Sequence, residues 1–301
     1  MVRKLTAALV PVMALALLAG CGAPAGTDKD LIDDWAMLGT PKVPSPPVGA
    51  CYTTTADTFQ TENITQFSFK LADSCTATHA SETFYVGDLT GSAASGTTPP
   101  KGEALKDGWA KCGSEAEKFL GGDYHDGRLE MLVLVPSATQ WTAGARYLRC
   151  DLAEVVSDGN KPVSRTSSLK GGLGGDKPAA LTCATEVYDT DGTSWLDYTP
   201  TSCTSTHNME YVGTYIANDQ AFPDSQDARK KLIRPGCEAI GAKYLNLTAT
   251  QLTNHQQVGI GYWMVGKEDW ERGNRAARCY AMLFDKKTTS KSIKGIGTAQ
   301  I

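Results

Sequence analysis

The sequence predicts an α+β fold made of two tandem small domains. Each is expected to be stapled by disulfides and to be a mostly antiparallel sheet with one packed helix. Three observations support this: a set of motifs that occurs twice, an even number of cysteines after the first one, and one order of strand-like and helix-like segments in each copy. The duplication decides the number of domains, because self-similarity at a fixed distance marks a repeated structural unit.

Three motifs occur twice in the same order. The first has the pattern C-T-x-T-H-x-x-E, the second places a cysteine seven residues before an aromatic-leucine pair, and the third has the pattern W-x-x-G-x-R-x-x-R-C. Corresponding cysteines are 125 to 132 residues apart, so only short insertions separate the copies. Besides cysteines, the repeated residues are His79, Glu82, Trp141, Gly144 and Arg146 in the first copy and His207, Glu210, Trp270, Gly273 and Arg275 in the second.

These motifs set the domain boundaries. We expect a signal peptide at 1–20, a lipidated tether at 21–47, a first domain at 48–155, a glycine-rich linker at 156–179, a second domain at 180–285 and a basic tail at 286–301. The tether is polar and contains several prolines, which suits a spacer. The tail is rich in lysine and small residues, so we expect it to be frayed.

Alternating and β-branched segments predict the strands, and runs of good helix formers predict one helix per copy. Strands are expected at 65–71, 82–89, 129–135 and 147–153, and at 209–216, 257–265 and 278–284. Helices are expected at 109–120 and 228–245, which places the third cysteine of each copy on a helix. Pro235 favours a start of the second helix near Cys237, because proline breaks a helix interior.

The cysteines predict a disulfide framework. Setting Cys21 aside leaves an even set, as expected in an exported chain: Cys51, Cys75, Cys112, Cys150, Cys183, Cys203, Cys237 and Cys279. No C-x2-C pair occurs, so neither a metal nor a cofactor is predicted. We favour pairing of the first cysteine with the second and the third with the fourth in both copies, because the first two bracket a hairpin. Pairing of the first with the fourth is the alternative.

The N-terminus has the features of a bacterial lipoprotein signal. Arg3 and Lys4 precede an apolar run at 5–19 that is shorter than the roughly 20 residues needed to span a bilayer. Small residues then lead to Cys21. The prediction is cleavage before Cys21, lipid and palmitate-type acyl chains on that residue, and an anchored protein on the extracytoplasmic face of the cell membrane. An ordinary signal peptide is the alternative.

Composition excludes one class of partner. The chain is 41% hydrophobic and 21% charged, and its formal net charge is -4. Nucleic-acid binding would need a basic surface, so no nucleic acid is expected.

The repeated histidine and glutamate resemble an acid/base pair. The chain contains no G-x-S-x-G, no H-E-x-x-H and no phosphate-binding loop to complete an active site. One catalytic site rarely needs two copies, so the motif favours a structural role in which the imidazole hydrogen-bonds to local backbone. We therefore predict no enzymatic activity.

The third motif has both structural and binding interpretations. Trp141 and Trp270 are expected to pack against the disulfides rather than to stack on sugars. The following glycines are expected to permit a turn before the last strand. The arginines (Arg146, Arg149, Arg275 and Arg278) are expected to pair with Glu82 or Glu210, with contact to an anionic polymer as the alternative.

The order of motifs resembles that of the septum formation domain family, with a leading cysteine, C-x-x-x-H-x-x-E, a helical cysteine and W-x-x-G-x-R-x-x-x-C. The resemblance covers most of the mature chain, in two tandem copies, and departs from the family where Thr78 and Thr206 replace a common proline. It implies an actinobacterial-type envelope protein with a role linked to division, and no established reaction.

Together these features predict a non-enzymatic envelope lipoprotein that presents two modules to division proteins, cell-wall proteins or the wall polymer. Two alternatives stay open at this point. One is a cell-wall hydrolase that uses the His–Glu pair, and the other is an extracytoplasmic sensor of a small ligand or metal.

Overall fold

A computed structural model describes residues 43–54, 69–157, 161–190 and 195–301. The predicted signal peptide, Cys21 and residues 65–68 of the first expected strand lie outside these ranges. Val43–Ile301 form one compact unit. We call residues 43–181 the first module and residues 182–301 the second module.

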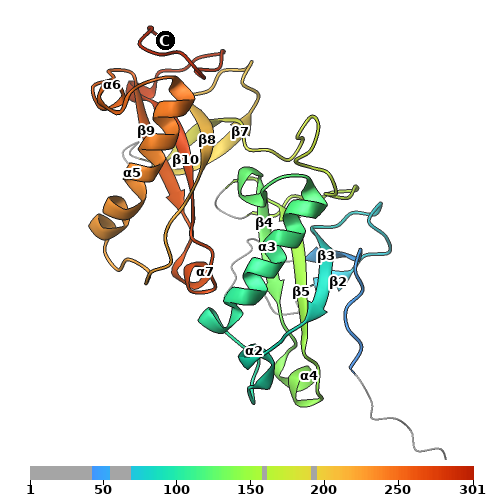
Figure 1. Cartoon of the computed structure of the whole chain (residues 1–301). Coiled ribbons are helices and arrows are strands. Elements are labelled where there is room, and N and C mark those ends of the chain that lie inside the picture. The colour runs from blue at the N-terminus through green and yellow to red at the C-terminus, as the bar shows by residue number, and fades with distance from the viewer. Residues whose placement is uncertain (1–42, 55–68, 158–160, 191–194) are drawn as a thin grey trace, which may run out of the picture. The chain divides into compact units, whose positions relative to one another are not determined.

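The first module is built on a five-stranded antiparallel sheet. Its strands are β1 (Cys51–Thr54), β2 (Phe69–Leu71), β3 (Ser81–Asp88), β4 (Leu129–Leu134) and β5 (Tyr147–Glu154). Their order in the sheet is β2-β1-β3-β5-β4, and helix α3 (Lys106–Leu120) lies across one face (Figure 1).

The second module repeats this architecture. Its strands are β6 (Cys183–Tyr188), β7 (Trp195–Thr201), β8 (Met209–Ile216), β9 (Val258–Met264) and β10 (Ala276–Leu283), in the order β7-β6-β8-β10-β9. Helix α5 (Gln226–Leu245) takes the place of α3 (Figure 1). Both sheets also contain a β-bulge beside the fourth cysteine of the module. It lies between β3 and β5 in the first module and between β8 and β10 in the second. The predicted α+β fold, with two disulfide-stapled sheet domains, is confirmed.

Short helices complete the described chain. They are α2 (Ser92–Ser95), α4 (Ala138–Thr142), α6 (Ala249–Thr253) and α7 (Lys267–Glu271), with 3-10 turns η3 (Gly102–Leu105), η4 (Tyr124–Asp126) and η5 (Phe284–Lys286). Helices α4 and α6 each begin with a capping box, in which an N-cap hydroxyl and a glutamine three residues on satisfy each other's backbone N–H groups.

Each long helix packs an apolar stripe onto its sheet. In α3 the buried residues are Trp109, Cys112, Ala116 and Leu120, at the three- and four-residue spacing that puts side chains on one helix face. In α5 the buried stripe includes Ile233, Cys237, Gly241 and Leu245. A Cβ on Gly241 would lie 2.3 Å from the Ile260 side chain, so any larger residue there would force that side chain to move.

Helix α5 differs from the sequence prediction at its start. It begins at Gln226, and Pro235 lies inside it, so the expected start near Cys237 is wrong. Ser225 caps the helix by accepting a hydrogen bond from the Ala228 N–H. Ile233 and Cys237, both fully buried, anchor the helix on either side of the proline. This packing offsets the roughly 3 kcal/mol that an interior proline costs.

The expectation of a frayed tail is also wrong. Ile293 is 2% exposed and belongs to the core of the second module. The glycine-rich stretch behaves likewise, because Leu169, Leu173 and Ala179 belong to the core of the first module. Both stretches therefore contribute to the fold of the module that precedes them.

Within the described parts of the chain, no helix combines the length and apolar character needed to cross a membrane.

Candidate functional site

The eight cysteines form four disulfides, Cys51–Cys75, Cys112–Cys150, Cys183–Cys203 and Cys237–Cys279, with Cα–Cα distances of 5.1 to 5.6 Å. The predicted pairing of first with second and third with fourth is confirmed in both modules, and the first-with-fourth alternative is wrong. The reason is the hairpin: β1 pairs with β2 and β6 pairs with β7, which brings the first two cysteines together at its open end.

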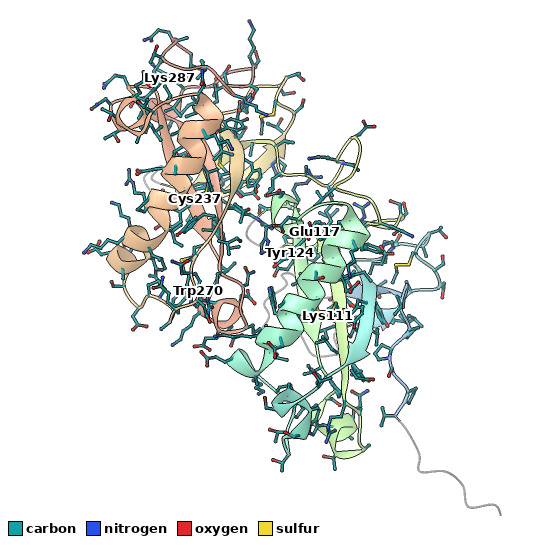
Figure 2. All side chains as sticks on the ribbon, viewed as in Figure 1. Lys111, Glu117, Tyr124, Cys237, Trp270 and Lys287 are labelled. Carbon is teal, nitrogen blue, oxygen red and sulfur yellow. A yellow bond between two sulfur atoms is a disulfide. The ribbon has the colours of Figure 1, made fainter. Side chains whose placement is uncertain are left out.

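The disulfides fall into two classes. Cys112–Cys150 and Cys237–Cys279 are fully buried and join each long helix to the last strand of its sheet; Figure 2 marks Cys237 on α5. The other two bonds close the hairpins and are less buried, because Cys75 and Cys203 are partly exposed. We call the first class core disulfides and the second class hairpin disulfides.

His79 is buried in the first module, with 2% of its surface exposed. Its Nδ1 lies 2.8 Å from the Ala77 carbonyl oxygen, and its main chain bridges to Arg165. A carbonyl only accepts, so Nδ1 carries the proton. Among the residues that the structure describes, Nε2 has no hydrogen-bond partner. The predicted hydrogen bond between imidazole and local backbone is confirmed.

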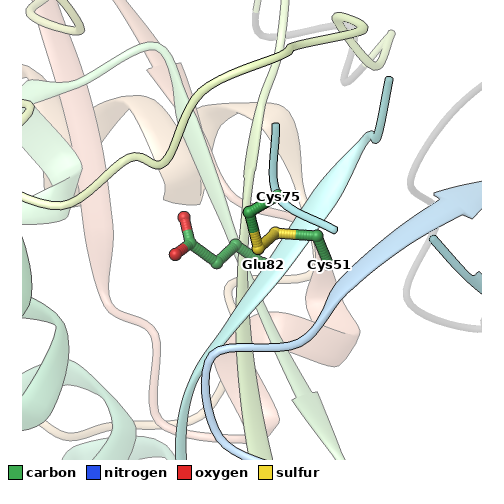
Figure 3. Close-up of side chains that lie close together, drawn as sticks. All are labelled: Cys51, Cys75 and Glu82. Atoms are coloured by element: carbon green, nitrogen blue, oxygen red, sulfur yellow. A yellow bond between two sulfur atoms is a disulfide. The ribbon is translucent and has the colours of Figure 1, made fainter. Parts of the chain in front are cut away.

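Glu82 lies beside the hairpin disulfide of the first module (Figure 3) and is 4% exposed. The Ser168 hydroxyl donates to its carboxylate at 2.8 Å, and the Leu169 N–H donates at 2.8 Å. These donors come from the segment after the last strand. A buried carboxylate needs such donors, because an unsatisfied buried charge is costly.

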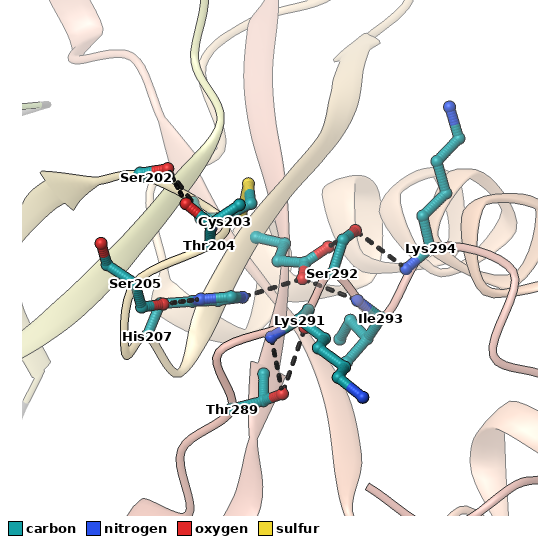
Figure 4. A network of polar contacts seen from close by, with 12 residues as sticks. Ser202, Cys203, Thr204, Ser205, His207, Thr289, Lys291, Ser292, Ile293 and Lys294 are labelled. Carbon is teal, nitrogen blue, oxygen red and sulfur yellow. Dashed lines mark hydrogen bonds and ion pairs between the residues drawn. A yellow bond between two sulfur atoms is a disulfide. The ribbon is translucent and has the colours of Figure 1, made fainter.

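His207 and Glu210 form a tighter pair in the second module, and each is 1% exposed. His207 Nδ1 lies 2.8 Å from the Ser205 carbonyl oxygen, and Nε2 lies 2.9 Å from Glu210 Oε1. Figure 4 shows this imidazole between Ser205 and the segment that contains Ser292 and Ile293. Because Nδ1 donates to a carbonyl, a second proton lies between Nε2 and the carboxylate.

Three further donors reach Glu210. The Tyr244 hydroxyl donates at 2.6 Å, the Ser292 hydroxyl at 2.9 Å and the Ile293 N–H at 2.7 Å. Burial and the hydrogen bond to Glu210 raise the pKa of Tyr244 well above its usual range, so this phenol remains a donor. The equivalent residue of the first module, Phe119, has no hydroxyl to offer.

A fourth repeated motif supplies the serine and main-chain donors to both glutamates, and sequence reasoning missed it. We call residues 165–173 and 289–297 the closing segments. They contain Ser168-Leu169-Lys170-Gly171 and Ser292-Ile293-Lys294-Gly295. The match was visible in the sequence, but serine, lysine and glycine are also typical of linkers and tails.

Each closing segment also completes a helix. Gly171 N–H donates to the Phe119 carbonyl of α3, and Gly295 N–H donates to the Tyr244 carbonyl of α5. These carbonyls lie in the last helical turn, where no partner within the helix exists. One segment therefore satisfies both the buried glutamate and the end of the long helix.

The tryptophans of the third motif are structural. Trp141 is 2% exposed and Trp270 is 0% exposed, and each belongs to the same core cluster as the core disulfide of its module. Figure 2 labels Trp270 and Cys237 in the second module. Their indole N–H groups donate to the Gly96 and Gln220 carbonyls at 2.9 and 2.7 Å. The predicted packing near the disulfides is confirmed, and the burial leaves no face for a sugar.

The glycine and arginine of this motif serve the same tryptophan. Gly144 and Gly273 have φ of +93° and +107°, which favours glycine in the turn before the last strand. The guanidinium of Arg146 lies 3.8 Å from the Trp141 ring centroid, and that of Arg275 lies 4.7 Å from the Trp270 ring.

The expected pairing of arginines with Glu82 or Glu210 is wrong. Two of the arginines donate to main-chain carbonyls: Arg146 to those of residues 94, 141 and 145, and Arg278 to those of residues 125, 127 and 129. The other two form ion pairs with aspartates, Arg149 with Asp151 and Arg275 with Asp219. The two glutamates lie at the other end of their strands, where the closing segment already satisfies them.

Hollows of about 250 and 530 Å³ lie in the described part of the chain, and none of the four His–Glu residues lines either of these two. Potential metal ligands lie together in two groups. One contains Cys51, Cys75 and Glu82, and the other contains Cys183, His207 and Glu210. Their sulfurs are in disulfides, so neither group offers a thiolate in this state.

Comparison with protein families gives one match, to the family described as Septum formation, over residues 48–279. The chain belongs to this family. The match runs through both modules as one stretch, so the duplication rests on the repeated motifs and the two equal sheet orders. No curated protein and no solved structure matches this member of the Septum formation family.

Proposed function

We propose that this chain is a non-enzymatic cell-envelope protein that presents two disulfide-stapled binding modules, with a role linked to septum formation. A lipid on Cys21 holds it at the outer face of the membrane, and its partners are division proteins, cell-wall proteins or the wall polymer. The family match supports the envelope role.

The observation that carries the proposal is the burial of the repeated motifs. The two His–Glu pairs and the two tryptophans are at most 4% exposed, and their hydrogen bonds are made within the chain. A catalytic acid or base must come within hydrogen-bond reach of a substrate, directly or through one water. Buried pairs with internal partners favour a structural role, which leaves the surface for recognition.

The outer edges of the two sheets are the surfaces that we propose for binding. Strands β2 and β7 occupy equivalent edge positions. Leu71 on β2 is 58% exposed, and Leu196 on β7 is 54% exposed. Edge strands offer unpaired backbone groups as well as side chains, so they are common sites for docking.

Crosslinking in cells tests this assignment. A photoreactive amino acid at position 71 or 196 should capture an envelope protein or wall fragment, which mass spectrometry would identify. The matched control carries the same group at exposed Lys118 on α3, away from the edge strands. Equal capture from all three positions would argue against edge-strand recognition.

The hydrolase alternative is tested with purified mature protein and peptidoglycan. We expect no new fragments from the wild-type chain. Fragments that disappear in the double variant His79→Gln/His207→Gln, while circular dichroism stays unchanged, would overturn the non-enzymatic proposal.

Lipid anchoring has a test of its own. The variant Cys21→Ser should move the protein from the membrane fraction to the soluble extracytoplasmic fraction, and metabolic labelling with a palmitate analogue should be lost. Retention of label in the variant would exclude Cys21 as the acylated residue.

A further inference from the structure

The hairpin disulfide of the second module lies against the His207–Glu210 pair. A Cys183 sulfur, a His207 ring nitrogen and a Glu210 carboxylate oxygen all lie within 4.8 Å of one another, and all three residues are buried. Cys203 is bonded to Cys183, so its sulfur is adjacent to the Cys183 sulfur, although it is not part of the group that lies within 4.8 Å. Two sulfurs, one imidazole and one carboxylate are therefore gathered from β6, β8 and the turn between β7 and β8.

In the oxidised chain these side chains already satisfy one another without a metal. The sulfurs are joined, and a proton bridges His207 Nε2 and Glu210 Oε1 at 2.9 Å. Without that proton, His207 Nε2 and the Glu210 carboxylate are both acceptors that face each other, so a cation must lie between them. A metal ion can take the place of the proton when further ligands are available.

We propose that reduction of Cys183–Cys203 creates a tetrahedral Zn²⁺ site with Cys183, Cys203, His207 and Glu210 as ligands. A dithiol supplies two electrons and two protons, so the disulfide becomes two thiols and the dithiol becomes a disulfide. Zn²⁺ then displaces both thiol protons and the proton between His207 and Glu210. Two thiolates, a neutral imidazole and a carboxylate remain as ligands, a donor set typical of zinc.

The geometry needs only a modest contraction. Zinc bonds of about 2.0 to 2.3 Å place neighbouring ligand atoms roughly 3.3 to 3.8 Å apart in a tetrahedron. The ligand atoms of Cys183, His207 and Glu210, which now lie within 4.8 Å of one another, must therefore approach by at most about 1.5 Å, and the Cys203 sulfur must turn towards them. Breaking the S–S bond frees both sulfurs for that movement.

The surrounding hydrogen bonds already orient the ligands. His207 Nδ1 donates to the Ser205 carbonyl, which directs Nε2 towards the site, as in many zinc proteins. Tyr244 and Ser292 donate to Glu210 Oε2, and the Ile293 N–H donates to Oε1, the oxygen that also faces His207 Nε2 and the proposed metal position. These contacts persist when the proton is exchanged for Zn²⁺.

Reduction reaches this bond before the core bonds. Cys203 is partly exposed, whereas Cys237 and Cys279 are fully buried. Thiol–disulfide exchange needs access of the attacking thiolate to a sulfur. A mild dithiol treatment should therefore open the hairpin disulfides selectively.

The first module is a matched control within the same chain. Cys51, Cys75 and Glu82 lie within the same limit, but His79 is not part of that group. Its set therefore has no imidazole, whereas the set of the second module has one.

The test uses the mature full-length chain with Co²⁺ and Zn²⁺ as probes. The protein is treated with limiting dithiol and freed of it without oxygen, and alkylation with mass spectrometry verifies which cysteines are free. We expect Co²⁺ to produce a thiolate-to-metal absorption band that Zn²⁺ abolishes, and X-ray absorption of the zinc form to report two sulfur and two nitrogen or oxygen ligands. No band with Cys183 and Cys203 free would overturn the proposal, as would four sulfur ligands.

Single variants assign the ligands. His207→Gln removes a direct ligand and should weaken Zn²⁺ binding by at least roughly 100-fold, the upper end of the loss for outer-shell partners, while His79→Gln leaves it unchanged. Glu210→Gln provides a second variant of nearly equal shape if His207→Gln does not fold. Unchanged affinity in a folded His207 or Glu210 variant would show that the site is not the one proposed.

Discussion

The two modules share every position of the buried His–Glu motif but satisfy it differently. In the second module Glu210 accepts from His207, Tyr244, Ser292 and Ile293. In the first module Glu82 accepts from Ser168 and Leu169, and His79 Nε2 is unpartnered within the described chain. The fold thus requires a buried carboxylate that the closing segment satisfies, whereas the contact to histidine is an addition of the second module.

The comparison predicts that the same substitution has unequal effects in the two modules. Guanidinium unfolding gives the total loss of stability, and hydrogen exchange with mass spectrometry assigns it to one module. The expectations below run from the largest effect to the smallest.

Removal of a core disulfide should have the largest effect, and it should be equal in the two modules. The sequence separations are 38 and 42 residues, so loop closure predicts a loss of about 4 kcal/mol in each case. The variants are Cys112→Ala/Cys150→Ala and Cys237→Ala/Cys279→Ala. A loss confined to one variant would mean that the modules use these bonds differently.

Removal of the glutamate should destabilise the two modules to different extents. Glu210→Ala leaves a buried histidine and three other donors without their acceptor, so we expect a loss of about 3 kcal/mol, as for a broken buried pair. Glu82→Ala strands only two donors and should cost about 1 to 2 kcal/mol. Exchange protection of residues 289–297 reports the first loss, and that of residues 165–173 reports the second.

Exchange of the aromatic residue should make the hydrogen bonding of the glutamate in each module resemble that in the other. Tyr244→Phe removes a hydroxyl that donates to a carboxylate and should lower stability by about 1.5 kcal/mol. Phe119→Tyr offers that hydroxyl to Glu82 and should raise stability by about 1 kcal/mol. Destabilisation by Phe119→Tyr would show that the hydroxyl does not reach Glu82.

The smallest and most equal effect is expected at the turn glycines. Gly144→Ala and Gly273→Ala each force an alanine into positive φ, at a cost of about 1 kcal/mol. The change in the unfolding midpoint should be alike for both variants, and Gly113→Ala, in the interior of α3 where an added Cβ meets open space, is the control of opposite sign. A cost at one glycine alone would contradict a shared role of the motif.

Much of the fold was accessible from the sequence because the motifs occur twice. The two disulfide-stapled sheet domains, the disulfide pairing and the helix that carries the third cysteine all depend on local spacing, and all are confirmed. Pro235 misled the prediction because its local cost is outweighed by the buried Ile233 and Cys237, which only the tertiary structure reveals. The arginine partners were wrong for a similar reason, since backbone carbonyls leave no mark in a sequence.

The candidate site was half predicted. Sequence reasoning found both histidines and glutamates and expected the histidine–backbone contact. It missed the role of Tyr244 and of the closing segments, because Tyr244 and Ser292 lie 34 and 82 residues along the chain from Glu210, the residue to which they donate. Their composition resembles that of a linker, so only the match between Ser168–Gly171 and Ser292–Gly295 could have indicated their role.

The disulfide order has a consequence for how the chain matures. The cysteines that follow Cys21 are bonded in consecutive pairs along the chain: the first with the second, the third with the fourth, the fifth with the sixth and the seventh with the eighth. A chain that emerges N-terminus first into an oxidising compartment therefore presents each cysteine with its correct partner before any wrong one arrives. We expect oxidation to keep pace with emergence, and disulfide shuffling, which takes seconds to hours, to be unnecessary.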